Sequence, residues 1–146
     1  MEAPEAYRLL VADVLELAGT VRRESESIAR AWGQTTARWH VLSVFSDVPL
    51  TVASGARRLG LARQNVQRVV NELILEGMLS ASPNPDHRVA SLIRTSETGR
   101  DMLAHLTTES DLRRERLLSA LDLRADELLH ARTTVQKVVA MFDLPE

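Results

Sequence analysis

Side chains suited to binding the edges of DNA bases are concentrated in two short segments. The first contains Arg63, Gln64, Asn65, Gln67 and Arg68. In the major groove, arginine can donate two hydrogen bonds to guanine, and an amide can bond twice to adenine. The second segment is Asn84-Pro85-Asp86-His87-Arg88, which combines turn residues with basic side chains. Together they predict a surface for double-stranded DNA.

The charge distribution supports this prediction, although the whole chain carries a net charge of −2. Between Thr51 and Arg94, six arginines stand against three acidic residues, a local excess of three positive charges. Attraction to phosphate depends on the field at the contacting face, so the local excess matters more than the total.

The sequence lacks the residue patterns that are typical of enzyme active sites and metal sites. The chain has no cysteine, and its histidines at positions 40, 87, 105 and 130 do not have metal-ligand spacing. No phosphate-binding glycine loop, nucleophile elbow or His-Glu-x-x-His segment is present. We therefore expect no catalytic residues, no metal and no cofactor, and we expect that the protein is not an enzyme. The acidic N-terminus lacks a signal peptide's apolar core, and no apolar run is long enough to span a membrane, which predicts a soluble cytoplasmic protein.

A helix-turn-helix is the element expected to position the first segment. Thr51 is a suitable N-cap for one helix, and Gly60 can end it with a positive φ. The next helix is predicted from about Ala62 to Glu76, ending before Gly77. Its apolar positions fall on one face and leave the arginines and amides on the other. A small residue at Ala56, a turn residue at Gly60 and an apolar residue at Val66 have the spacing that this motif requires.

A β-hairpin is expected to carry the second segment. Residues 78–82 and 89–94 are predicted strands on either side of the turn, and Leu50 is placed where a very short strand could pair with them. Helix-turn-helix and hairpin together predict a winged helix-turn-helix over residues 34–95.

Long amphipathic helices are expected outside this unit. Residues 7–28, a segment capped by Ser96, and residues 125–142 each have apolar residues at helical spacing, and residues 36–45 form a shorter helix. The predicted fold is mainly α with a small β-hairpin wing (α+β), with dimerisation helices at 1–33 and 96–146. Their apolar stripes would be exposed in a lone chain, which favours a two-fold homodimer over helices that pad a monomeric core.

Several segments resemble the multiple antibiotic resistance regulator (MarR) family of winged helix-turn-helix proteins. They are residues 59–73, Glu76-Gly77-Met78-Leu79, residues 84–88 and residues 92–100. The order of the surrounding helices agrees as well, so the likeness covers nearly the whole chain. It implies a dimeric transcription regulator, usually a repressor, that binds a pseudo-palindromic operator and is released by a small effector.

The resemblance also implies roles for individual residues. The side chains of the helix after Gly60 would face bases and phosphates, and Arg88 would enter the minor groove, oriented by Asp86. Arg57 and Arg58 would contact phosphate, and His87 would either contact phosphate or cover the turn. Each charged residue could instead belong to an ordinary solvated surface. Ala62 departs from the family pattern, which often places a capping Ser or Thr there.

An effector site is expected near the start of the second helix, at Trp32, Arg38, Trp39 and His40. Two indole rings and a guanidinium could hold a small aromatic or phenolic ligand by stacking and a charge-assisted bond. The alternative is that Trp39 belongs to the core and Arg38 to the surface. For the chain as a whole, the alternative function is a winged helix that binds another protein rather than DNA.

Overall fold

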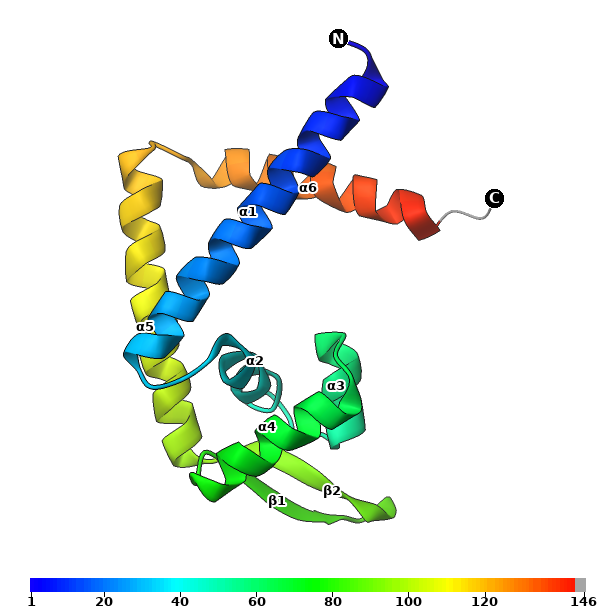
Figure 1. Ribbon diagram of the computed structural model, residues 1–146, viewed down its shortest axis with the longest axis vertical. Helices are drawn as coiled ribbons and strands as arrows, with labels where there is room; N and C mark the ends of the chain where they lie inside the picture. The colour runs from blue at the N-terminus through cyan, green and yellow to red at the C-terminus, as the bar shows by residue number, and fades with distance from the viewer. Residues whose placement is uncertain (144–146) are drawn as a thin grey trace. The chain divides into compact units, whose positions relative to one another are not determined.

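The structure is a computed structural model that describes residues 1–143, and its elements are predominantly helical (Figure 1). In chain order they are α1 (Ala3–Ala31), α2 (Thr36–Val44), α3 (Val52–Leu59), α4 (Arg63–Leu75), β1 (Leu79–Asn84), β2 (His87–Thr95), α5 (Glu97–Ala120), α6 (Ala125–Ala140) and the 3-10 turn η1 (Met141–Asp143). The chain divides after residue 110 into two compact units, and the boundary falls within α5. The predicted mainly α fold with a two-stranded wing is confirmed. The predicted domain boundaries at residues 33 and 95 stay a prediction.

The core of the first unit lies where α2, α3 and α4 pack together. Phe45, Leu42, Val70 and Leu73 are buried there. The Phe45 ring lies so close to Gly55 of α3 that a Cβ on Gly55 would come within 2.5 Å of the ring. Any larger residue at position 55 would therefore push α3 away from α2.

The helix-turn-helix forms as the sequence predicts. Thr51 accepts a hydrogen bond from the Ser54 N–H at its side-chain oxygen, which caps α3. Gly60 ends α3 in the left-handed conformation at φ 65°, which few residues other than glycine adopt without strain. The buried face of α4 consists of Val66, Val69, Val70 and Leu73. This packing turns the opposite face of α4 toward solvent.

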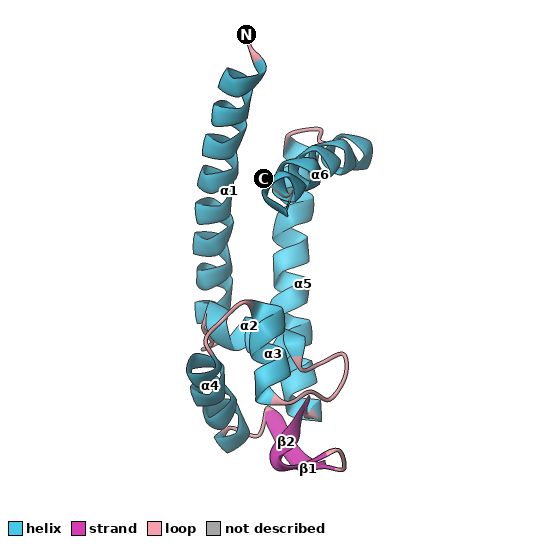
Figure 2. Cartoon of the chain, turned by 90° about the vertical axis from the view of Figure 1, so that its right-hand side faces the viewer, coloured by secondary structure: helices cyan, strands magenta, loops and turns pink. Residues whose placement is uncertain are grey.

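The wing is a two-stranded antiparallel hairpin that extends from the helices (Figure 2). Leu79 pairs with Thr95 and Ser82 with Leu92, and an irregularity follows before Asn84 pairs with His87. Both strands are longer than predicted because the pairing continues to the Pro85-Asp86 turn. Leu50 forms the expected bridge to the wing, with mutual backbone bonds to Ile93 of 3.1 and 2.7 Å.

Close backbone contacts hold the base of the wing against α5. Ser96 caps α5 by accepting a bond from the Gly99 N–H, and its hydroxyl donates to the Gly77 carbonyl. A Cβ on Gly99 would lie only 2.0 Å from the Met78 carbonyl oxygen. Gly99 therefore permits α5 to start directly over the end of α4.

A second, smaller core joins the end of α1 to α5 within the first unit. Ile28 and Ala29 of α1 pack against Leu106, with Trp39 and Met102 beside them. In the second unit, by contrast, α6 has no buried residue among those described. None of the helices in residues 1–143 combines the length and apolar character that crossing a membrane requires.

Candidate nucleic-acid interface

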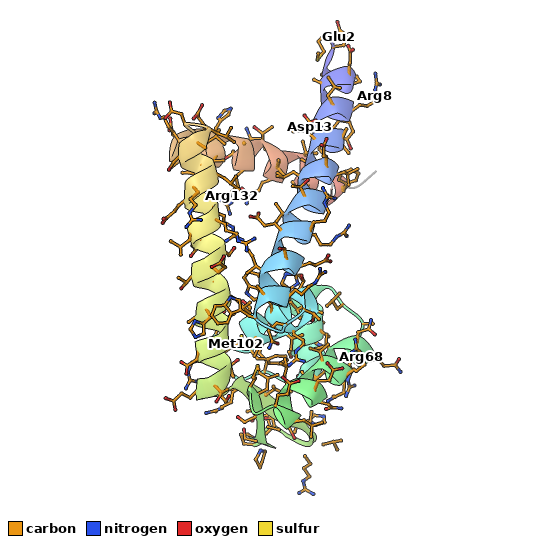
Figure 3. All side chains as sticks on the ribbon, turned by 60° about the vertical axis from the view of Figure 1, so that its left-hand side comes forward. Glu2, Arg8, Asp13, Arg68, Met102 and Arg132 are labelled. Atoms are coloured by element: carbon orange, nitrogen blue, oxygen red, sulfur yellow. The ribbon has the colours of Figure 1, made fainter. Side chains whose placement is uncertain are left out.

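The solvent-facing side of α4 brings most of the predicted base-reading residues together. One open surface cavity is lined by Arg63, Gln64, Gln67, Arg68, Asn71, Glu72 and Leu75. Arg68 extends outward from α4, and its side chain is 65% exposed (Figure 3). Asn65 is also exposed, but it does not line this cavity. Four of the five predicted α4 residues thus share one continuous surface.

Two hydrogen-bonded pairs organise this surface along the helix axis. Gln67 donates from Nε2 to Oδ1 of Asn71 at 2.9 Å, and Arg68 donates from Nη1 to Oε1 of Glu72 at 2.7 Å. Both pairs span four residues, the spacing at which side chains on a helix are neighbours. The Arg68 guanidinium therefore lies along the helix beside the Glu72 carboxylate.

The start of α4 carries no side-chain cap. Ala62 occupies the N-cap position with extended backbone angles, and its methyl side chain cannot accept a bond from the first turn. The backbone N–H groups of a first helical turn lack partners within the helix and carry partial positive charge. Because Leu61, Ala62, Arg63 and Gln64 are all exposed, this end of α4 is open to an anion.

A second cavity connects α4 to the wing. Arg63, Gln67 and Asn71 of α4 line it together with residues 51–53 at the start of α3 and residues 89–91 of β2. The helix and the wing, which are separate in the sequence, therefore border a common concave surface.

The wing tip differs in one respect from the expectation drawn from the resemblance. We expected Asp86 to orient Arg88 through a charge-assisted bond, but among the described residues no ion pair joins them. The Asp86 N–H instead donates to Oδ1 of Asn84 at 3.0 Å. Both side chains are exposed, and an ion pair between them would add little to stability in water.

His87 has a structural contact within the tip. Its Nδ1 accepts bonds from the N–H groups of Val89 and Ala90, at 3.3 and 3.2 Å. These bonds fit the turn-covering role expected for His87, and its contact with phosphate stays a prediction. Arg88 next to it is exposed. On α3, Arg57 donates to Oγ of Ser54 at 3.0 Å, and Arg58 is exposed.

Three of the four residues expected to hold an effector have side-chain contacts within the chain. Trp32 stacks on His105 with ring centroids 4.5 Å apart, and Trp39 packs against the smaller core. Arg38, whose side chain is only 13% exposed, donates from Nη2 to Oε2 of Glu76 at the end of α4. His40 is exposed. A carboxylate ligand would therefore reach the Arg38 guanidinium in competition with Glu76.

The pKa of Glu76 reflects this contact. The hydrogen bond from Arg38 holds the pKa of the carboxyl below its ordinary value; partial burial acts in the opposite direction, and the Arg38 charge adds a smaller lowering. Glu76 is therefore ionised over the whole neutral range. It ties the C-terminal end of α4 to the first turn of α2.

Three residues of the α4 surface were missed by sequence reasoning as site residues. Asn71, Glu72 and Leu75 line the cavity but were not included in the predicted site. The signal was present, because positions 64, 68, 71 and 75 continue one helical stripe. On α4 the predicted site ends at Arg68, about two helical turns before Leu75.

Comparisons with known proteins agree with this geometry. A family model described as MarR family matches residues 32–88. An uncharacterized protein of Mycobacterium tuberculosis is 49% identical over 113 residues, which is 77% of this chain and 79% of that protein.

Solved structures share the fold. Staphylococcus aureus MarR in complex with salicylate and kanamycin superposes with a TM-score of 0.85 at 8% identity, over 94% of this chain and 93% of that one. A MarR family transcriptional regulator from Streptomyces coelicolor gives a TM-score of 0.74 at 19% identity, over 99% and 100% of the two chains. At these identities the likeness concerns the fold alone.

Proposed function

The chain belongs to the MarR family of transcriptional regulators, and from that premise we propose that it binds a specific duplex operator through α4 and the wing. One observation carries the proposal: Arg63, Gln64, Gln67 and Arg68 line a single exposed surface at the helix-turn-helix position. The α4 helix is the element expected in the major groove, where these side chain types distinguish base pairs. Such a regulator acts in the cytoplasm, in contact with the chromosome.

Phosphate contacts would position this helix on the duplex. The uncapped start of α4 supplies backbone N–H groups, and Arg57 and Arg58 supply charge from α3. The shared cavity between α4 and β2 supports a wing that follows the backbone beside the groove. Arg88 at the exposed tip is suited to the adjacent minor groove, with Asp86 and His87 next to it.

Two charge-removing substitutions test the proposal. Arg68→Ala and Arg88→Ala should each weaken binding to the duplex upstream of the protein's own gene by about 1–3 kcal/mol. Each should also flatten the dependence of affinity on salt, since fewer counterions are released. Fluorescence anisotropy titrations at several salt concentrations measure both quantities.

A matched control removes a positive charge elsewhere. Arg8 is exposed on α1, far from Arg68 within the first unit (Figure 3). Arg8→Ala should leave affinity and salt slope close to those of the wild type. Unchanged binding in the Arg68→Ala and Arg88→Ala variants would contradict the proposal. A wild-type chain that binds no duplex even at low salt would favour the alternative of a winged helix for protein contacts.

We also propose that the protein acts as a homodimer, which would place two copies of α4 on a pseudo-palindromic operator. Support comes from large apolar side chains that are exposed in the single chain. They include Leu15 and Leu17 of α1 and Leu117, Leu129 and Phe142 of the second unit. Sedimentation equilibrium should give twice the chain mass. A monomer at micromolar concentration would contradict this part of the proposal.

Repression relieved by a small aromatic or phenolic effector is the remaining part of the proposed function. The name of the S. aureus structure records salicylate as a ligand of that protein. In this chain, Trp32 and Trp39 near Arg38 and His40 are the residues we expect to respond to such a ligand. Calorimetric titration with salicylate, followed by the same titration of Arg38→Met, tests the assignment. Equal affinity in both proteins would remove Arg38 from the site.

A further inference from the structure

An acidic residue lies within the surface proposed to face a polyanion. Glu72 lines the α4 cavity together with Arg63, Gln64, Gln67 and Arg68, and its side chain is 41% exposed. It is the only acidic residue in that lining. Its Oε1 accepts from Nη1 of Arg68 at 2.7 Å, so the carboxylate is held among the predicted base-reading groups.

A carboxylate at this position is repelled by phosphate whatever the DNA sequence. The local excess of positive charge, on which non-specific binding depends, is therefore reduced by Glu72. The Arg68–Glu72 pair further occupies an arginine that could otherwise bind a phosphate. These two effects weaken binding to every duplex.

Only one base offers a compensating contact of the right chemistry. An ionised carboxylate accepts hydrogen bonds and cannot donate, and the donors in the major groove are cytosine N4 and adenine N6. Adenine N6 lies beside the N7 acceptor, which repels a carboxylate. Cytosine carries no acceptor beside N4 on its own major-groove edge, and the guanine paired with it presents N7 and O6 as acceptors for an arginine. The Arg68–Glu72 pair thus has the donor and acceptor pattern that complements a G·C base pair.

We propose that Glu72 is a specificity-determining residue: it weakens binding to all duplexes and recovers that loss only where its carboxylate accepts from cytosine N4, with Arg68 on the paired guanine. This inference rests on the proposed function. Discrimination between DNA sequences would then depend partly on repulsion between Glu72 and phosphate, which weakens binding to competing sites along the chromosome.

The first test compares Glu72→Gln with the wild type on two duplexes, the one upstream of the protein's own gene and a shuffled sequence of equal composition. Glutamine retains the shape and helix propensity of glutamate without its charge. Affinity for the shuffled duplex should rise, and its log–log salt slope should steepen by up to about 0.9. Between 50 and 200 mM salt, that slope corresponds to about a 3.5-fold additional change in affinity. Affinity for the upstream duplex should rise less or fall, so the ratio of the two affinities decreases.

The control removes a negative charge away from α4. Asp13 is exposed on α1, far from Arg68 within the first unit (Figure 3), and Asp13→Asn should leave the affinity ratio unchanged. If Glu72→Gln behaves like Asp13→Asn while the wild type binds the upstream duplex, the inference is wrong and the proposed function stands. If the wild type prefers neither duplex, it is the proposed function that fails.

Selection from a randomised duplex pool provides a second readout. The wild type should select a G·C pair at one position of each half-site, and Glu72→Gln should lose that preference while keeping the rest of the motif. Identical motifs from both proteins would overturn the assignment to cytosine.

Discussion

Replacing Glu76 with alanine would test how α4 is held in place against α2. Arg38 on α2 and Glu76 at the C-cap of α4 form an ion pair between two elements that share the main core. The Arg38 side chain is 13% exposed, and its Nε has no hydrogen-bond partner among the residues the structure describes. Glu76→Ala would leave this mostly buried cation without its counter-charge.

The exposure of the two side chains determines how much folding free energy the Glu76→Ala substitution should cost. Removing one partner of a fully buried ion pair costs about 3–5 kcal/mol of folding free energy. Glu76 is 47% exposed, so solvent screens part of the interaction, and we expect a loss of about 1–3 kcal/mol. Arg38→Met should cost less than Glu76→Ala, because methionine fills the space of the arginine stem and the half-exposed Glu76 remains solvated.

The dependence on pH follows from the lowered pKa of Glu76. A glutamate ionises near pH 4.5 when unfolded and at lower pH in this fold, because Arg38 donates a hydrogen bond to it. The stabilisation is therefore complete above about pH 4.5 and is lost as pH falls through the pKa of the folded state. Wild type and Glu76→Ala should converge in stability at acid pH.

Urea unfolding followed by circular dichroism, at pH 7 and at several values below 4.5, measures these differences. All proteins should be compared at one chain concentration, since association would shift the apparent stability. An Arg38→Met variant less stable than Glu76→Ala at pH 7 would refute the argument that the buried cation dominates. A Glu76→Ala deficit that does not change with pH would refute the assignment of the effect to ionised Glu76.

Three further substitutions test the fold by thermal unfolding. Gly99→Ala should destabilise by about 3 kcal/mol or more, because its Cβ would meet the Met78 carbonyl oxygen at 2.0 Å; a loss below 1 kcal/mol would show that the backbone adjusts easily. Ala62→Ser should stabilise by about 0.5–1 kcal/mol by adding the cap that α4 lacks, and an unchanged midpoint would mean that the hydroxyl does not reach the first turn. Thr95→Val should cost about 1–2 kcal/mol by removing the buried 3.1 Å bond to the Leu42 carbonyl, and a neutral result would show that this carbonyl finds another donor.

The helices and the wing could be predicted from the sequence because their signals are local. A threonine cap at Thr51, a glycine at Gly60 and the apolar stripe of α4 each depend on residues within a few positions. The Leu50–Ile93 bridge was also expected, because the turn before Leu50 and the hairpin pattern are both visible in the sequence. The lengths of the strands were underestimated, since pairing across the Pro85-Asp86 turn depends on both strands at once.

Contacts between distant residues could not be predicted in this way. Nothing near Arg38 in the sequence indicates Glu76, and the stacking of Trp32 on His105 joins α1 to α5 across more than seventy residues. At the wing, by contrast, the resemblance led us to expect a contact between Asp86 and Arg88 that is not found in the part of the chain that the structure describes. Among the described residues no ion pair joins them, and both side chains are exposed at the tip.

The most direct test of the central claim is an anisotropy titration of the wild-type protein with the duplex upstream of its own gene, repeated from 50 to 200 mM salt against a shuffled competitor. The account predicts preference for the upstream duplex and a log–log slope of several units, since the two arginines of the α4 cavity, Arg88 and the start of α4 would replace counterions. Equal affinity for both duplexes, or binding that does not respond to salt, would contradict it.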